Sequence, residues 1–314
     1  MQIPLSHKAA TASGWINGFI GVLIFSGSLP ATRVAGRELH PIFLTATRAS
    51  VAAVLALCLL LLSKEKRPTA KQLLPLGIVA GGVVLGFPLL SALALQYVTS
   101  AHSIVFLGLL PLTTALFGVL RGGERPHPAF WVFSVMGSLL VIGYAIAQGL
   151  SASPAGDLLM LLAVIVCGLG YAEGAKLSRE LGGWQVISWA LVLSLPVMTP
   201  LAFLRLPLSF AAISPAAWIS LAYVSVFSMF IGFVFWYRGL ARGGIAAVSQ
   251  LQLLQPFFGL AVAAGLLHEE VSMGMLGITV GVILCVAGSK RFSRKAVTGK
   301  PAVRQQKHKQ QQAV

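Results

Sequence analysis

The chain has 314 residues, of which 57% are hydrophobic and only 10% are charged, and its formal net charge is +15. Soluble domains carry about 25% charged residues, so this chain has too few charges to cover a water-facing surface. The composition therefore excludes a soluble enzyme, a disordered chain, a secreted disulfide scaffold and a nucleic-acid-binding domain. It indicates a polytopic helical membrane protein.

Ten apolar runs follow one another along the chain, each about long enough to cross a bilayer, which takes roughly 20 helical residues. They lie at 15–34, 42–63, 73–96, 99–120, 129–148, 155–177, 184–204, 215–237, 245–267 and 271–289. The first run lacks a signal-peptide cleavage pattern, so we interpret it as a membrane helix. The sequence thus predicts an all-α membrane protein with ten transmembrane helices.

Positive charges lie mainly on one side of the predicted membrane. If the N-terminus is cytoplasmic, only Arg33, Arg37, Arg48 and Arg205 of the 23 lysines and arginines fall outside. The positive-inside rule then predicts that both termini are cytoplasmic and that the protein is a multi-pass protein of the cell (inner) membrane. The basic, glutamine-rich tail at 290–314 is expected to be disordered and attracted to anionic headgroups rather than to nucleic acid.

The two halves of the chain resemble each other when Pro111 is aligned with Pro256, and both prolines are expected to break their helices. Each proline is followed 13 residues later by an acid, Glu124 or Glu269. An Arg-Glu-Leu triplet recurs at a similar offset, at 37–39 and 179–181. Each half holds five spans, and because five is odd, the second copy of a duplicated unit lies upside down. Inverted repeats are the architecture of alternating-access transporters.

This repeat divides the chain into four parts. They are a cytoplasmic segment at 1–14, a first five-helix repeat at 15–148, a second five-helix repeat at 155–289 and the tail at 290–314.

The aligned segments 94–124 and 239–270 each combine a small-residue loop, a helix with a mid-span proline and an acidic end. In these features the chain resembles the EamA-type branch of the drug/metabolite transporter superfamily, over about residues 14–290. The resemblance implies a ten-helix carrier that exports or exchanges small metabolites, including amino acids and related compounds. His268 departs from the family pattern, which often has glycine at this position.

The ninth span has the densest set of polar side chains: Ser249, Gln250, Gln252 and Gln255. Ser249, Gln252 and Gln255 are spaced three apart and share one helical stripe, whereas Gln250 lies beside it. A glutamine both donates and accepts hydrogen bonds, which suits a zwitterionic or amide-bearing substrate. We expect these residues to line the substrate pathway. Hydrogen bonding between helices is the alternative.

Four other residues are candidates for the pathway. Tyr171 lies deep in the sixth span. Trp236, near the end of the eighth span, and Tyr97, near the outer end of the third, could instead belong to the aromatic belt common at membrane interfaces. Arg48, about two turns into the second span, resembles an arginine common in the family. It either extends outward to the headgroups or meets an anionic group of the substrate.

Glu173 is the one acid that lies clearly within a span. It could pair with Lys176 on the helix surface. Alternatively, it faces a cavity and couples transport to protons. The other acids lie at loops or helix ends, so the sequence gives little support for a relay of buried carboxylates, and facilitated diffusion or exchange stays open.

Small residues recur at helical spacing in two spans. G-x-x-x-G patterns, which allow close helix contact, a homodimer or sliding of helices, occur at Gly77, Gly81, Gly82, Gly86, Gly277 and Gly281. The three cysteines have no C-x-x-C spacing, and we expect Cys58, Cys167 and Cys285 to be buried apolar residues.

No enzyme motif of the H-E-x-x-H, G-x-S-x-G or P-loop type occurs, and the six histidines lack metal-ligand spacing. We therefore expect no catalytic residue, cofactor or metal. The sequence favours a carrier that moves a small polar or amphipathic metabolite by alternating access, with export implied by the resemblance. A membrane-embedded enzyme and a non-transporting scaffold are the alternatives.

Overall fold

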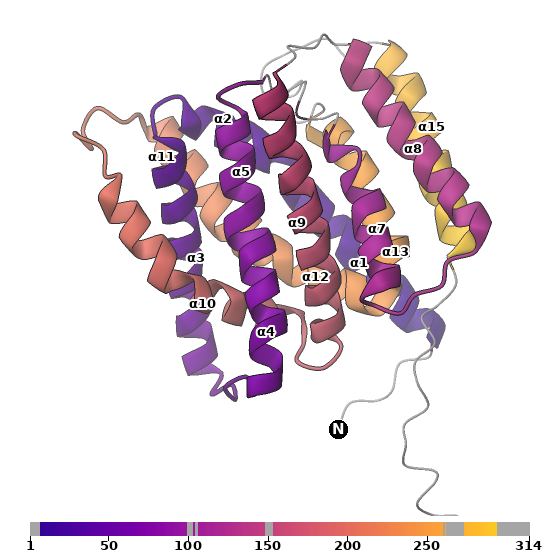
Figure 1. Cartoon of the computed structure of the whole chain (residues 1–314), viewed down its shortest axis with the longest axis horizontal. Coiled ribbons are helices and arrows are strands. Elements are labelled where there is room, and N and C mark those ends of the chain that lie inside the picture. Colours follow the sequence, from indigo (N-terminus) through magenta and orange to yellow (C-terminus); the bar gives the residue numbers. More distant parts are fainter. Residues whose placement is uncertain are drawn as a thin grey trace, which may run out of the picture.

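The computed structural model describes residues 7–98, 103, 106–147, 153–259, 261 and 273–293. Every regular element in these ranges is a helix, and the helices form ten successive spans (Figure 1). The predicted all-α class and the ten helices are therefore confirmed. Several predicted features lie outside the described residues: parts of the fourth, ninth and tenth spans, His268 and Glu269, the first six residues, and the tail from residue 294.

The first five spans consist of eight labelled elements, several of which join without a loop. They are α1 (His7–Ser26) with α2 (Ser28–Gly36); α3 (Pro41–Leu62); α4 (Ala70–Val79) with η1 (Ala80–Gly86) and α5 (Phe87–Ala94); α7 (Leu110–Leu120); and α8 (Pro128–Ala147).

The last five spans follow the same scheme. They are α9 (Pro154–Ser178); α10 (Gly183–Leu204); α11 (Pro215–Tyr223) with η2 (Val224–Ile231) and α12 (Gly232–Gly243); α13 (Ile245–Ser249) with η3 (Gln250–Leu254); and α15 (Met273–Phe292).

Local sequence sets many of the helix starts. The His40 side chain accepts a hydrogen bond from the Ile42 N–H directly before α3, and Thr69 forms a capping box with Gln72 at α4. Ser214 caps α11 in the same way. These side chains satisfy N–H groups that the first helical turn leaves unpaired.

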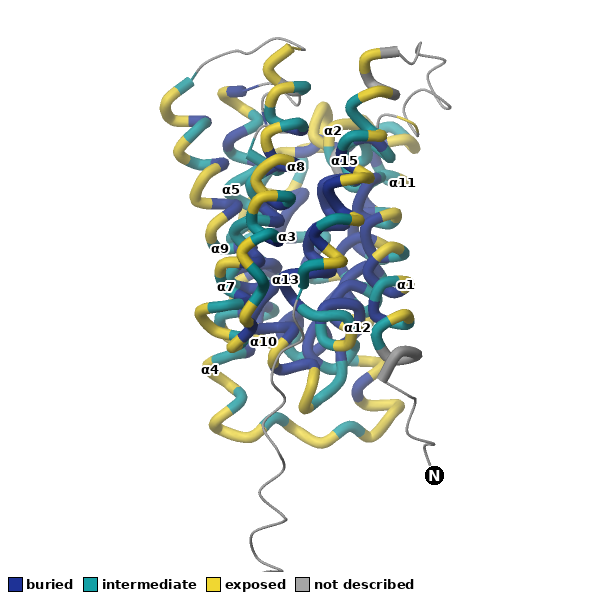
Figure 2. The backbone as a smooth tube through the Cα atoms, turned by 90° about the vertical axis from the view of Figure 1, so that its right-hand side faces the viewer, coloured by how far each residue is buried: buried dark blue, intermediate teal, exposed yellow. Residues whose placement is uncertain are grey.

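Six of the helical spans are long and apolar enough to cross a membrane. Large apolar side chains such as Leu62, Leu74 and Leu139 are more than 60% exposed on the outside of the bundle. Figure 2 shows exposed residues along the outer helices and buried residues between them. An exposed apolar surface of this extent is expected where lipid replaces water around the protein.

The contacts between spans relate the two halves of the chain. The first span packs on the eighth through α1 and α12, and the third packs on the sixth through α5, η1 and α9. Further pairs are α3 with α10, α7 with α13, and α8 with α15. α7 also packs on α9, and the counterpart of this pair in the other half, α1 with α13 and η3, is a smaller contact. In an internal repeat, each of the first five spans corresponds to the span five places later. Under this correspondence the pair of spans one and eight becomes the pair six and three, and the pairs two–seven, four–nine and five–ten are unchanged.

A second feature recurs in both halves. The third span contains the π-helix η1 and the eighth contains the π-helix η2, each in the middle of its span and each between two α-helical segments. π-Helical turns are rare, so their presence at the same place in two five-span halves is an independent sign of an internal repeat.

Glycines bring some of these spans into close contact. A Cβ atom on Gly239 would lie 2.6 Å from the Gly18 nitrogen, and one on Gly14 would lie 2.3 Å from the Gly243 nitrogen. Only glycine permits this crossing of α1 and α12. In the third span, a Cβ on Gly82 would meet the α9 backbone, 2.4 Å from the Val166 carbonyl.

Two sequence expectations are wrong in detail. A Cβ on Gly77, Gly81 or Gly277 would meet nothing within 4 Å among the described residues, so these glycines make no close helix contact. Cys58 is exposed on α3, whereas Cys167 and Cys285 are buried as expected.

Helix ends meet at two opposite faces of the bundle. On one face, the Lys290 ammonium lies 4.5 Å from the Trp15 ring centroid, and Gln185 donates to Glu65. This basic face, toward the lower edge of Figure 1, is where α4 begins and α3, α7 and α9 end. The segments at these ends and at the ends of α12 and α15 contain Lys64, Lys66, Arg67, Lys71, Arg121, Arg125, Lys176, Arg179, Arg238, Arg242, Lys290 and Arg291. The opposite face holds the α2–α3 and α10–α11 connections.

Candidate functional site

Four aromatic side chains from three spans meet inside the bundle. Tyr171 of α9 lies with its ring centroid 5.5 Å from that of Trp236 and 6.0 Å from that of Phe233, both on α12. Phe25 of α1 packs edge-to-face on Phe233 at 5.0 Å and on Trp236 at 6.1 Å. We call Phe25, Tyr171, Phe233 and Trp236 the aromatic cluster. Trp236 is fully buried, so assignment of this residue to an interfacial aromatic belt is wrong.

The polar stripe of the ninth span reaches this cluster. The Tyr171 side chain lies near that of Gln252, and the Gln255 amide donates to the Phe25 carbonyl at 3.5 Å. Ser249 donates to the Ala246 carbonyl at 2.9 Å within its own helix. Gln250 to Leu254 form a 3-10 helix, in which side chains three apart align. Tyr171, Trp236, Gln252 and Gln255 are thus brought together.

Pro256 explains this local geometry. A proline has no N–H, so it cannot donate to the carbonyl of Gln252 four residues earlier. The Gln255 N–H bonds to that carbonyl instead, which tightens the helix to 3-10 geometry. Pro111 lies at the start of α7, after a turn at 108–109. Both prolines therefore lie where an α-helix is interrupted.

Several buried polar atoms of the eighth and ninth spans have no partner among the described residues. They are the Trp236 indole nitrogen, Nε1, and the side-chain oxygens of Gln250 and Gln252. Leaving such an atom unpaired costs about 1–3 kcal/mol. A donor on Trp236 and acceptors on the neighbouring span can bind a small molecule that offers the complementary groups. We call Tyr171, Trp236, Gln250, Gln252 and Gln255 the central polar site.

Glu173 lies two residues after Tyr171 on α9 and is 1% exposed. Its carboxylate accepts a hydrogen bond from the Arg121 guanidinium at the end of α7. The predicted pair with Lys176 is therefore wrong. Glu173 faces the packed side of α9, whereas Lys176 is exposed.

Glu124, which sequence reasoning identified only as a marker of the repeat, joins three spans. Its two carboxylate oxygens accept hydrogen bonds from the Ile245 and Ala246 N–H groups, at 2.7 and 2.8 Å, at the start of α13. Arg179 donates to the same carboxylate at 3.1 Å. We call Arg121–Glu173 and Arg179–Glu124 the basic-face ion pairs, because they tie the fourth, sixth and ninth spans together at that face.

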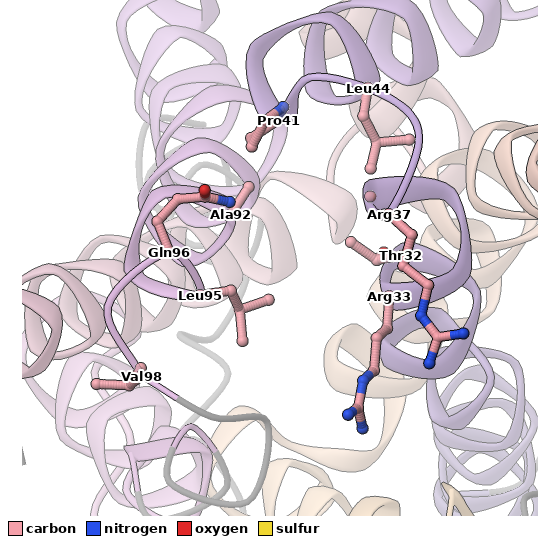
Figure 3. A pocket seen from close by; sticks show the side chains of 10 residues that line it. Thr32, Arg33, Arg37, Pro41, Leu44, Ala92, Leu95, Gln96 and Val98 are labelled. Carbon is pink, nitrogen blue, oxygen red and sulfur yellow. The ribbon is translucent and has the colours of Figure 1, made fainter. Parts of the chain in front are cut away.

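The opposite face is hollowed by a cavity of about 290 Å³ between α2 and α5 (Figure 3). We call it the vestibule. It is lined by Thr32, Arg33, Gly36, Arg37, Pro41, Leu44, Ala92, Leu95, Gln96 and Val98. Sequence reasoning used Arg33 and Arg37 to orient the chain, and Arg37 also as part of the repeated triplet, but neither as a site residue. Tyr97, beside the lining residue Gln96, is 57% exposed and lies apart from the aromatic cluster.

Arg48 lies on α3, four residues after the lining residue Leu44. It is half-buried, and its Nε atom is buried without a partner among the described residues. No acidic side chain in that part of the chain forms an ion pair with Arg48.

The described residues contain no group of three or more His, Cys, Asp or Glu side chains that could hold a metal ion.

Comparison with known proteins gives consistent matches. The family model described as "EamA-like transporter family" matches this chain twice, at residues 12–146 and 154–289. The chain is 65% identical over 284 residues to the uncharacterized transporter YdeK of Bacillus subtilis (strain 168), covering 90% of this chain and 99% of that protein. An uncharacterized transporter of Archaeoglobus fulgidus is 23% identical over 271 residues, covering 85% and 92%.

A solved crystal structure has the same fold. It superposes with a TM-score of 0.75 at 19% sequence identity and covers 88% of this chain and 98% of the other. At this level of identity the likeness concerns the fold alone.

Proposed function

Because the chain belongs to the EamA-like transporter family and is a multi-pass membrane transporter rather than an enzyme, we propose that it moves a small polar or amphipathic metabolite by alternating access. An amino acid or a related compound is the proposed substrate, and export is the proposed direction. The predicted family and the multi-pass membrane location are confirmed. Family membership also sets aside the membrane-embedded enzyme and the scaffold.

The proposed architecture is a pair of inverted five-helix repeats at 15–148 and 155–289. Two observations support it: the pairing of spans survives an exchange of the halves, and each half has a π-helix in its third span. With five spans in each repeat, one repeat is upside down in the membrane, as in transporters that bind substrate where their repeats meet. Segment 1–14 and tail 290–314 lie outside the repeats in this proposal.

The proposed orientation places the basic face in the cytoplasm. Twelve of the basic side chains that the structure describes gather at this face, and lysine and arginine are enriched in cytoplasmic loops. Both termini would then be cytoplasmic and the vestibule would open outside, in the inner membrane of the cell.

The proposed substrate site is the central polar site, with Ser249 beside it. The unpaired Trp236 donor and Gln252 acceptor next to Tyr171 carry this proposal, because a bound polar molecule would satisfy both. Pro111 and Pro256 interrupt the helices around the site, and Tyr97 would lie at its outer entrance.

The proposed access state is outward-facing. The basic-face ion pairs close one end of the bundle, while the vestibule hollows the other. Glu173 is the proposed coupling carboxylate, since protonation of Glu173 would release Arg121 and loosen the basic face.

Counterflow in proteoliposomes tests this function. Vesicles are preloaded with a pool of amino acids and related metabolites and assayed with and without a pH gradient. We expect saturable exchange that Gln252→Ala abolishes and that the control Gln185→Ala, on the basic face, retains. Glu173→Gln should keep exchange but lose its response to the pH gradient. Wild-type protein that folds but exchanges no member of the pool would contradict the proposed substrate class.

A further inference from the structure

We propose that the vestibule is an anion-recognition site and that the substrates of this carrier are small amphipathic carboxylates. In this view Arg33 and Arg37 capture the carboxylate at the outer face, and Arg48 receives it on the way to the central polar site. The inference rests on the proposed function in so far as it treats the vestibule as the outer end of a transport pathway.

The described lining of the vestibule carries positive charge. Arg33 and Arg37 are its charged residues, and no acid is among the lining residues that the structure describes. They lie four residues apart on α2, so both side chains share one helix face. Figure 3 shows both guanidinium groups on one wall and the amide of Gln96 on the wall across from them. A carboxylate between these walls would meet two cations and a hydrogen-bond donor.

The nearest acid in sequence is already engaged. The Glu38 carboxylate accepts hydrogen bonds from the Ser214 N–H at 2.6 Å and from the Ser214 hydroxyl at 2.7 Å. These bonds lower the pKa of Glu38 and hold its charge against the start of α11. Glu38 therefore does not neutralise Arg33 or Arg37.

The distribution of arginines gives a second argument. Basic residues are disfavoured on the translocated side of a membrane protein. Among the lysines and arginines in the described part of the chain, only Arg33, Arg37, Arg48 and Arg205 lie away from the basic face. Two of these four line the vestibule and a third, Arg48, lies one helical turn below its lining residue Leu44. A cavity that binds an uncharged ligand would not explain why these arginines gather at the vestibule.

Arg48 extends the site toward the centre of the membrane. It lies seven residues into α3, about 10 Å below Pro41 at the outer end, and shares a helix face with Pro41 and Leu44. Side chains on a helix lean toward its N-terminus, which for Arg48 is the direction of the vestibule. Its buried, unpartnered Nε is costly in a membrane span unless an anion binds there. A carboxylate fits a guanidinium with two parallel hydrogen bonds.

The walls and the size define the rest of the ligand. Leu44, Ala92, Leu95 and Val98 supply apolar surface beside the arginines. A cavity of about 290 Å³ is at the small end of the range for ligand sites. These features suit a compact molecule with one carboxylate and a short apolar part.

A binding measurement tests the inference without requiring transport. Thermal unfolding of the full-length protein in a neutral detergent is followed with increasing isovalerate, and with its uncharged amide, isovaleramide, at matched ionic strength. We expect a saturable rise in Tm with isovalerate and none with the amide. Arg37→Gln and Arg33→Gln should each weaken apparent isovalerate affinity at least tenfold. Arg205→Gln, which removes an arginine of the same face outside the vestibule, should leave it unchanged.

Other outcomes would overturn the inference. Equal shifts in Tm with isovalerate and isovaleramide would show that charge is not recognised. An equal loss of isovalerate affinity in Arg205→Gln would show a diffuse charge effect.

The same unfolding measurement in phosphatidylglycerol nanodiscs tests a lipid as the source of the anion. A rise in Tm with this lipid that depends on the vestibule arginines, with no rise from isovalerate, would assign the anion to a lipid headgroup. Arg48→Gln should weaken binding while Arg48→Lys restores part of it. Isovalerate binding without any counterflow would refute the proposed function but not the site.

Discussion

Glu124 shows how one carboxylate can hold three spans of a membrane protein together. It is 2% exposed and accepts from the first two N–H groups of α13 and from Arg179. A helix N-terminus carries partial positive charge, so the carboxylate both satisfies unpaired donors and interacts with the helix dipole. A neutral side chain of the same shape would lose the ion pair and half of the acceptor capacity.

We therefore expect Glu124→Gln to lower the free energy of unfolding by about 2 kcal/mol, the scale of a lost charged hydrogen bond. Unfolding in mixed detergent and SDS micelles measures the change. Glu180→Gln is the matched control, because Glu180 is exposed on the same face. Equal stability of Glu124→Gln and the wild type would contradict the capping role.

Part of the central polar site can be predicted at the level of single residues. Gln252 and Tyr171 are recognisable from the sequence because polar groups inside apolar spans are costly and rare. Phe25 and Phe233 are not, because an aromatic residue in an apolar span looks the same whether it faces lipid or another ring. The partner of Glu173 also depends on which helix lies opposite, and helical spacing alone pointed to Lys176.

At the scale of elements, the crossing of α1 and α12 depends on glycine. Gly14 and Gly18 face Gly239 and Gly243. A Cβ atom on Gly14 or Gly239 would meet backbone, whereas one on Gly18 or Gly243 would first meet the Val248 side chain. The sequence contains these G-x-x-x-G pairs, yet the pattern is equally present at Gly77 and Gly81, where no helix approaches. Spacing identifies glycines that can face one another, and only the fold decides which do.

Gly239→Ala should therefore destabilise the protein by about 1–3 kcal/mol, the cost of overpacking. Gly77→Ala is the control and should be neutral or stabilising by up to about 1 kcal/mol, because alanine is the better helix former and the space is open. Melting temperatures in detergent compare the two variants. A Gly239→Ala protein as stable as Gly77→Ala would show that this crossing tolerates a methyl group.

Irregular helical segments are harder to predict from the sequence than the spans themselves. Pro256 accounts for the 3-10 helix before it, since a missing N–H has a fixed consequence. Neither η1 nor η2 contains a proline, and their hydrophobic pattern does not differ from that of an ordinary span. The ten spans could be predicted from hydropathy because each must cover the same hydrocarbon thickness. The two π-helices could not, because hydropathy alone does not distinguish a π-helical turn from an α-helical one.

For the whole molecule, the proposed mechanism treats the ion-paired basic face and the hollowed opposite face as one of two access states in exchange. In this proposal the basic-face ion pairs stabilise the outward-facing state, in which they are formed, and not the inward-facing state, in which they are broken. Removing them should shift the population toward the inward-facing state, by the free energy that they add to one state and not to the other. The proposed orientation and the proposed mechanism therefore share one measurement.

Single cysteines are placed in a variant without Cys58, Cys167 and Cys285. Their labelling tests both the proposed orientation and the proposed change of access. We expect a membrane-impermeant maleimide to label Gln96→Cys, in the vestibule, only from outside the cell, and Lys66→Cys, on the basic face, only from the cytoplasmic side of inverted vesicles. Adding Arg121→Gln and Arg179→Gln to Gln96→Cys should slow its labelling several-fold, because the vestibule closes as the basic face opens. Reversed sidedness would refute the orientation. Unchanged labelling of Gln96→Cys after both arginines are removed would show that the basic-face ion pairs do not bias access.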